Sequence, residues 1–96
     1  MTRDDIIARL ESCREDMARL DVASLSIFGS VARNEAGVDS DIDILVSFSG
    51  ASTFDRYMDL KALLEQATGR RVDLVTQAAL RPELRADIER EAVRVA

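Results

Sequence analysis

Apolar residues recur along this chain at two spacings, one typical of helices and one typical of strands. Within residues 2–20 they return every three or four positions, which predicts one amphipathic helix. Its apolar stripe comprises Ile6, Ile7, Leu10, Cys13, Met17 and Leu20. Thr2, followed three positions later by Asp5, predicts a capping box at its start. Because Cys13 lies on the apolar stripe, we expect it to pack in the core rather than to react.

Three short segments alternate with a period of two and predict strands: residues 24–28, 41–48 and 71–75. In the second segment the even positions are all apolar. The odd positions are Asp41, Asp43, Leu45 and Ser47. In the third segment Asp73 lies on the opposite face from its apolar neighbours. Side chains on a strand alternate between faces, so the acidic residues are expected on the polar face of a sheet.

Helical and loop patterns fill the intervals between these strands. Residues 29–33 predict a short helical turn and residues 34–40 a loop. Residues 53–68 predict a longer helix, which Gly69 ends as a C-cap. Tyr57 lies within this helix, where packing is a more natural role for it than catalysis.

The C-terminal segment, residues 81–96, carries Pro82 where a helix would have its first turn. Leu84, Ile88 and Ala92 would share the apolar side of that helix, whereas Val93 and Val95 fit a terminal strand equally well. The resulting order of helices and strands predicts an α/β fold with a small mixed β-sheet flanked by helices.

Composition narrows the possible chemistry. With 96 residues, the chain is expected to form a single domain, residues 1–96. It has no histidine and one cysteine, which excludes an internal disulfide, a Cys-His nucleophile and a zinc site of Cys and His ligands. No apolar run is long enough for a membrane span and the N-terminus is charged, so a cytoplasmic location is expected.

The net charge of −5 disfavours general binding to nucleic acids, whose backbones are also negative. A basic series near the C-terminus could be a local exception: Arg81, Arg85, Arg90 and Arg94. These residues alternate with acidic ones, namely Glu83, Asp87, Glu89 and Glu91. A mixed, solvated helix face is therefore the preferred interpretation.

Asp41 and Asp43 form the most informative pair in the sequence. They project from the same face of one predicted strand, with carboxylates about 5–7 Å apart before any adjustment. Two anions this close repel each other, and a divalent cation would remove the repulsion. Mg²⁺ prefers oxygen ligands, typically one or two carboxylates together with water and substrate phosphates.

Gly29 and Ser30 follow the first predicted strand and supply a second feature. Glycine allows the backbone to approach a ligand closely, and the following helical turn offers N–H groups and a hydroxyl to an anion. Carboxylates beside an anion-binding turn suit a nucleoside triphosphate. An Asp-x-Asp triplet alone arises easily by chance, and a Gly-Ser pair alone is usually a simple turn. The prediction of a nucleotide site therefore depends on the combination of both motifs with Asp73.

The segments "FGSVAR" and "SDIDILV", with ten residues between Gly29-Ser30 and Asp41-Ile42-Asp43, resemble the signature of the DNA polymerase beta-like nucleotidyltransferase superfamily. The chain looks most like the minimal nucleotidyltransferases, or MNT-type proteins, over nearly its whole length. It departs from them at Asn34, where many relatives carry glycine.

The resemblance implies a polymerase beta-like nucleotidyltransferase fold and a set of site residues. Asp41 and Asp43 would bind two Mg²⁺ ions, and Asp73 would be the third metal-binding carboxylate and help to deprotonate the acceptor hydroxyl. Gly29 and Ser30 would bind the phosphates of ATP. Arg33 could also contact phosphate, although a surface position suits it equally well.

The resemblance also implies a partner. MNT-type proteins are paired with helical HEPN-domain toxins, and act as antitoxins by transferring AMP from ATP to a tyrosine of the toxin. Two alternatives remain open: an antitoxin that neutralises its partner by binding alone, and a transferase acting on a small molecule such as an aminoglycoside. Transferases of the latter kind usually carry an additional helical domain.

Overall fold

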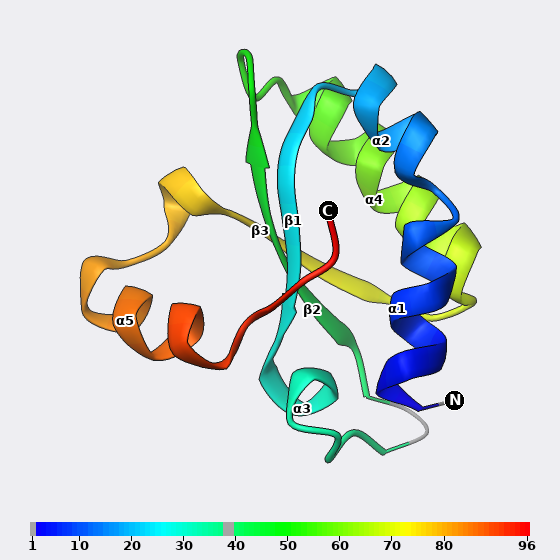
Figure 1. The fold of residues 1–96 in the computed structure, drawn as a ribbon. Coiled ribbons are helices and arrows are strands. Elements are labelled where there is room, and N and C mark those ends of the chain that lie inside the picture. The colour runs from blue at the N-terminus through cyan, green and yellow to red at the C-terminus, as the bar shows by residue number, and fades with distance from the viewer. Residues whose placement is uncertain (1, 38–39) are drawn as a thin grey trace.

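A four-stranded mixed sheet forms the centre of the fold (Figure 1). In the computed structural model, which describes residues 2–37 and 40–96, the strand order is β3-β2-β1-β4. The strands are β1 (Val22–Phe28), β2 (Ile42–Phe48), β3 (Val72–Thr76) and β4 (Val93–Arg94). β1 is antiparallel to β2 and β4, whereas β2 and β3 are parallel. The predicted α/β fold with a small mixed sheet is confirmed.

Residues 38 and 39 of the predicted 34–40 loop lie outside the described residues.

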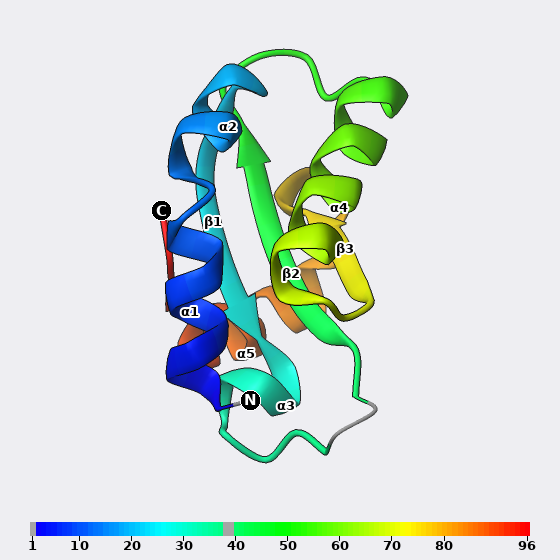
Figure 2. The same ribbon diagram turned by 90° about the vertical axis from the view of Figure 1, so that its right-hand side faces the viewer.

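Helices are distributed unequally over the two faces of this sheet (Figures 1 and 2). One face is covered by α1 (Arg3–Glu11), α2 (Arg14–Arg19) and α4 (Phe54–Thr68). The short α3 (Gly29–Ala32) follows β1 at the end of the sheet, and a 3₁₀ turn, η1 (Gln77–Ala79), follows β3. α5 (Pro82–Glu91) lies on the opposite side and leaves much of the second face open.

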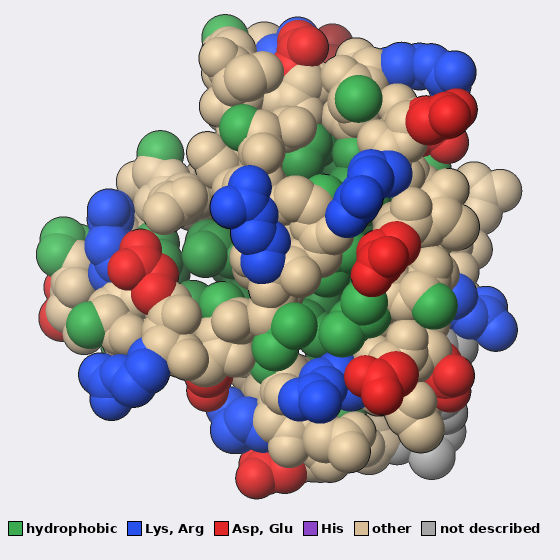
Figure 3. Space-filling model, in the orientation of Figure 1, with side chains coloured by type: hydrophobic (Ala, Val, Ile, Leu, Met, Phe, Trp, Pro, Cys, Tyr) green, Lys and Arg blue, Asp and Glu red, His purple; other side chains and the backbone are tan. Residues whose placement is uncertain are grey.

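The C-terminal segment combines both of the structures that its pattern allowed. α5 begins at Pro82 as expected, and the alternative of a terminal strand is confirmed for Val93, whereas Val95 lies just after β4. None of the residues of α5 is buried. Figure 3 shows acidic and basic side chains intermingled on this side of the molecule, as expected for a mixed, solvated surface.

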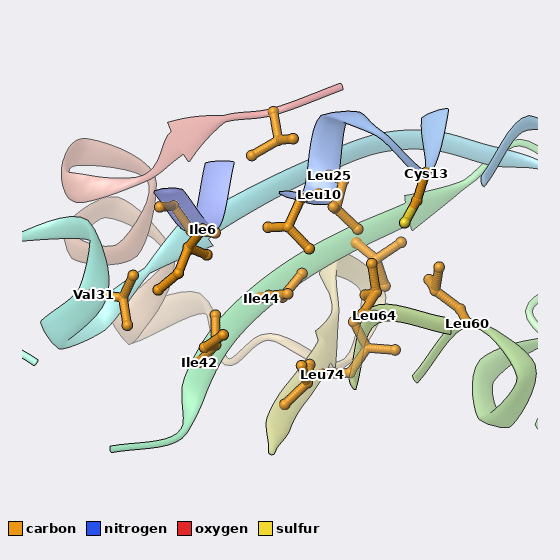
Figure 4. Packing of buried hydrophobic residues seen from close by; sticks show 14 of the residues in the cluster. Ile6, Leu10, Cys13, Leu25, Val31, Ile42, Ile44, Leu60, Leu64 and Leu74 are labelled. Atoms are coloured by element: carbon orange, nitrogen blue, oxygen red, sulfur yellow. The ribbon is translucent and has the colours of Figure 1, made fainter. Parts of the chain in front are cut away.

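The core lies between the sheet and the helices of the covered face (Figure 4). Leu10 of α1, Leu25 of β1, Ile44 of β2 and Leu64 of α4 are all fully buried. The even positions of β2 point into this core, as their alternation predicts, and Cys13 packs in the same cluster. Each fully buried side chain of this size contributes about 1.5–3 kcal/mol relative to an exposed one, so this face accounts for most of the hydrophobic stabilisation.

The prediction of one continuous N-terminal helix is wrong, because the segment forms α1 and α2 with a break at Ser12 and Cys13. The Ser12 hydroxyl donates a hydrogen bond to the carbonyl of Arg9, and the Cys13 N–H donates to Leu10, which tightens the turn. The capping box of Thr2 and Asp5 is confirmed. A break of this kind keeps the apolar stripe facing the sheet, so hydrophobic spacing alone does not reveal it.

The longer helix and the strand after it follow the sequence pattern closely. Thr53 caps α4 by accepting a hydrogen bond from the N–H of Arg56, and Gly69 ends the helix in the left-handed conformation at φ 69°. The Tyr57 hydroxyl donates to the carbonyl of Leu74 in β3, which ties α4 to the sheet and supports a packing role. In the part of the chain that the structure describes, no helix combines the length and apolar character that crossing a membrane requires.

Candidate active site

Three aspartates lie near one another at one end of the open face of the sheet. Asp43 lies in β2, directly in register with Asp73 of β3 on one side and Phe28 of β1 on the other. Asp41 immediately precedes β2, because this strand begins at Ile42, one residue later than predicted. The parallel pairing of β2 and β3 thus brings Asp73 beside Asp43 from a position thirty residues later in the sequence.

Asp43 carries the clearest electrostatic signature of the three. Partial burial raises the pKa of its carboxyl above the ordinary value, and the negative charges of Asp73, Asp41 and Glu91 raise it further. Arg33 opposes this shift only weakly. Ionisation of Asp43 is therefore less favourable than that of an ordinary aspartate, and a bound cation would oppose this shift.

Asp41 is held differently from Asp43. Its carboxylate forms an ion pair with Arg71 at 3.3 Å, and the two side chains are 47% and 83% exposed. Over residues 2–37 and 40–96, no three potential ligands already lie close enough together to hold a metal ion. The oxygen donors and the mutual repulsion of the aspartates suit Mg²⁺ in chemistry, although in this structure one carboxylate oxygen of Asp41 is paired with Arg71.

Gly29 forms the bend between β1 and α3, next to Asp43. Its φ of 72° is in the left-handed region that favours glycine, and a Cβ at this position would lie 2.2 Å from the Oδ2 atom of Asp43. Any other residue would therefore be strained and would displace the carboxylate. The Arg3 guanidinium donates to the carbonyl of Ala32 at 3.1 Å and fastens the far end of α3 to α1.

Ser30 and Asn34 lie on either side of the end of α3. Ser30 is half-buried in α3, and its carbonyl accepts a hydrogen bond from the N–H of Glu35 at 2.8 Å. Asn34 adopts a φ of 60°, in the left-handed region. Asparagine tolerates this conformation better than most residues, so Asn34 can maintain this turn.

Glu91, the last residue of α5, also belongs to this site. Its Oε1 atom accepts a hydrogen bond from the N–H of Gly29 at 3.0 Å, and its Oε2 atom accepts one from Arg33 at 2.9 Å. These hydrogen bonds, that from Gly29 foremost, hold the pKa of Glu91 below its ordinary value. Arg33 also donates to Glu35 at 3.1 Å, and its two acidic partners raise its pKa.

Glu91 lies on the unburied helix α5, as the prediction of a solvated face expects, but both of its carboxylate oxygens are also engaged beside the site. The sequence contains no signal that could have shown this. Glu91 is one of several alternating charges, and its position depends on how α5 returns to the sheet. Arg94, assigned to the same face, instead lies in β4.

A hollow of about 300 Å³ continues the open face of the sheet beyond the aspartates. Ser24, Ser26 and Leu45 line it from the strands, and Gln77, Glu89 and Arg94 line it from the segments around them. Ser26 and Leu45 are paired across β1 and β2, two positions along the strand from Asp43. The hollow is therefore on the same face of β2 as Asp43.

Residues 10–95 match the nucleotidyltransferase domain family. The chain belongs to this family. The match includes every predicted site residue, from Gly29 to Asp73, together with Glu91. The resemblance that the Gly-Ser and Asp-x-Asp motifs indicated is thereby confirmed.

Relatives of this nucleotidyltransferase agree with the family assignment. It is 34% identical over 96 residues to the protein adenylyltransferase MntA of Thermococcus cleftensis, covering 99% of this chain and 97% of that protein. A solved structure assigned as a minimal nucleotidyltransferase matches it with a TM-score of 0.86 and 41% identity, over 97% of this chain and 95% of the other. The predicted nucleotidyltransferase fold is confirmed.

A more distant structure has the same fold within a complex. It is described as a tri-AMPylated HEPN toxin of Shewanella oneidensis with its MNT antitoxin. The match has a TM-score of 0.59 and 19% identity, over 85% of this chain and 67% of the other. At this identity the likeness shows the fold alone.

Proposed function

We propose that this nucleotidyltransferase transfers AMP from ATP to a tyrosine hydroxyl of a HEPN-domain toxin and thereby acts as its antitoxin. The observation that carries the proposal is the pairing of Asp43 with Asp73 across β2 and β3, next to the Gly29 bend and near enough to Asp41 for its charge to raise the pKa of Asp43. The names of the relatives, protein adenylyltransferase and MNT antitoxin, support the substrate and the partner.

In the proposed reaction the acceptor oxygen attacks the α-phosphorus of ATP. A new bond forms between this oxygen and phosphorus, the bond to the β-phosphate oxygen breaks, and pyrophosphate leaves. Asp73 receives the hydroxyl proton, directly or through water. Asp41 and Asp43, with Asp73, would hold two Mg²⁺ ions, which neutralise phosphate charge and lower the pKa of the attacking hydroxyl when bound.

Gly29, Ser30 and Arg33 would bind the phosphates at the other end of the site. The backbone N–H of Gly29 and the guanidinium of Arg33 already hold an anionic group, the Glu91 carboxylate, within 3.0 Å and 2.9 Å respectively. A carboxylate and a phosphate oxygen are recognised by the same donors. This occupancy supports anion binding at the position that the sequence assigns to phosphate.

The acceptor would come from a second protein. The hollow on the same face of β2 as Asp43 is open and polar, and residues 1–96 act in this proposal as one nucleotidyltransferase domain. A partner protein would place its tyrosine over the open face, within reach of Asp73.

The direct test is to incubate the purified protein with a HEPN-domain protein encoded beside it, in the presence of ATP and Mg²⁺. Intact-mass measurement is expected to show AMP added to the partner. The variant Asp43→Asn should abolish the addition, whereas Asp59→Asn, which removes an exposed charge from α4, should not. Mutation of the modified tyrosine to phenylalanine in the partner should remove the acceptor.

An unmodified partner after this incubation would refute the transferase proposal. If the unmodified partner were nevertheless inhibited, and Asp43→Asn inhibited it equally, neutralisation by binding alone would replace it. Omission of Mg²⁺ with excess chelator tests the metal requirement separately, and unchanged transfer would show that the aspartates act without it.

A further inference from the structure

Glu91 occupies the place where a phosphate group is expected to bind. One carboxylate oxygen accepts from the Gly29 N–H and the other from the Arg33 guanidinium, so a single side chain joins the two groups assigned to nucleotide binding. The Glu91 side chain is only 30% exposed. Both hydrogen bonds involve an ionised group, the stronger kind of hydrogen bond in proteins.

Glu91 adds a negative charge to surroundings that are already negative. Its carboxylate contributes to the repulsion that raises the pKa of Asp43, so the end of α5 adds negative charge to a site already rich in it. The position is stable only because the Gly29 N–H and Arg33 compensate the charge. These are the donors that an incoming triphosphate also needs, so Glu91 and phosphate compete for them.

We propose that Glu91 is an internal competitor of the nucleotide: it fills the phosphate position in the free protein and must leave when ATP binds. The proposal deepens the proposed function and rests on it. It assigns Glu91 a regulatory role in nucleotide binding rather than a role in the chemical step.

The competition also links the site to α5. Glu91 ends this helix, α5 buries none of its own residues, and its contacts include α3 and β1. Release of Glu91 removes two of the hydrogen bonds that hold the end of α5 against the site. Because binding equilibria are reciprocal, whatever draws α5 away from α3 also favours nucleotide binding.

The test compares variants by titration calorimetry with a non-hydrolysable ATP analogue and Mg²⁺, and with inorganic tripolyphosphate. Glu91→Ala empties the position, and Glu91→Gln keeps the size of the side chain without its charge. Both are expected to bind the analogue roughly three- to tenfold more tightly than the wild type, as removal of one competing charged group implies.

Glu35→Gln is the matched control. Glu35 also pairs with Arg33, but the Gly29 N–H donates to Glu91 and not to Glu35. This variant therefore removes one negative charge, as the Glu91 variants do, but leaves Glu91 in the phosphate position. Its affinity is expected to stay within about twofold of the wild type, as for a weak surface ion pair. Hydrogen exchange should show that the analogue reduces protection at the end of α5 in the wild type.

The outcomes separate this proposal from the proposed function. Unchanged or weaker binding by both Glu91 variants, or an equal gain in Glu35→Gln, overturns the competition. Tighter binding by the Glu91 variants without any AMP transfer supports the competition and refutes the transferase. If neither the wild type nor any variant binds the analogue or tripolyphosphate, there is no phosphate position and both proposals fail.

Discussion

Replacing Asp43 with asparagine should stabilise the free protein while abolishing the proposed activity. The pKa of Asp43 is raised by burial and by neighbouring carboxylates, so its charge opposes folding at neutral pH. Asp73 lies opposite it on the adjacent strand, which places the carboxylates about 5–7 Å apart. For partly exposed groups at an effective dielectric constant of about 40–80, the repulsion is about 1 kcal/mol.

Asp41 adds less to this repulsion, because Arg71 partly compensates its charge. We therefore expect Asp43→Asn to raise the free energy of unfolding by about 1 kcal/mol, which corresponds to about 4–8 °C in Tm for a domain of this size. The assay is thermal unfolding in a buffer containing a chelator, with Asp59→Asn as the exposed control. The control should change the free energy by less than about 0.5 kcal/mol.

The stability difference between Asp43→Asn and the wild type should depend on pH. Because the folded pKa of Asp43 lies above the unfolded one, the cost of its charge is present at neutral pH and disappears as the pH falls below the raised pKa. The advantage of Asp43→Asn should shrink over the same range. Millimolar Mg²⁺ should stabilise the wild type and not the variant. A destabilised variant at neutral pH, or an advantage that grows on acidification, would refute the electrostatic reasoning.

Three further substitutions test other parts of the structure. Gly29→Ala should destabilise the protein by at least about 1–2 kcal/mol and greatly reduce AMP transfer, because the new Cβ would meet the Asp43 carboxylate and the backbone at this position is left-handed. Denaturant unfolding and the AMP-transfer assay measure these two effects. Tyr57→Phe should cost about 0.5–1.5 kcal/mol through the lost hydrogen bond to Leu74 but retain transfer, and an inactive, well-folded variant would contradict the packing role. Leu64→Ala should cost about 2–5 kcal/mol in urea unfolding, and a cost below about 1 kcal/mol would show that the core does not depend on α4.

Much of the fold was predictable because the relevant signals are local. Alternation fixed which face of β2 enters the core, and Gly69 and Pro82 marked helix ends through their own backbone restrictions. The break between α1 and α2 was not predictable, since the hydrogen bonds of Ser12 and Cys13 leave the apolar spacing intact.

Some residues of the candidate site were also predictable from local signals, and others were not. Gly29 and Asp43 could be placed because each lies at the end of a strand within one short motif, and Asp73 because its strand has the same alternation. Glu91 could not, because its contact with Gly29 joins residues 62 positions apart. Only the path of the chain from α5 into β4 brings it there, and that path depends on tertiary pairing with β1.

The uneven covering of the sheet explains how a small protein can hold such an unfavourable group of charges. The core lies on one face, where α1, α2 and α4 pack against the strands, so the aspartates on the other face can repel one another without disturbing it. Asp41 is restrained by Arg71, whereas Asp43 is left with a raised pKa. In the proposed function a bound cation would relieve the repulsion on Asp43 and would compete with Arg71 for Asp41. ATP would compete with Glu91 for Gly29 and Arg33. Ligand binding at this site is then a series of exchanges, in which each charge of the substrate complex replaces an interaction that the free protein already makes.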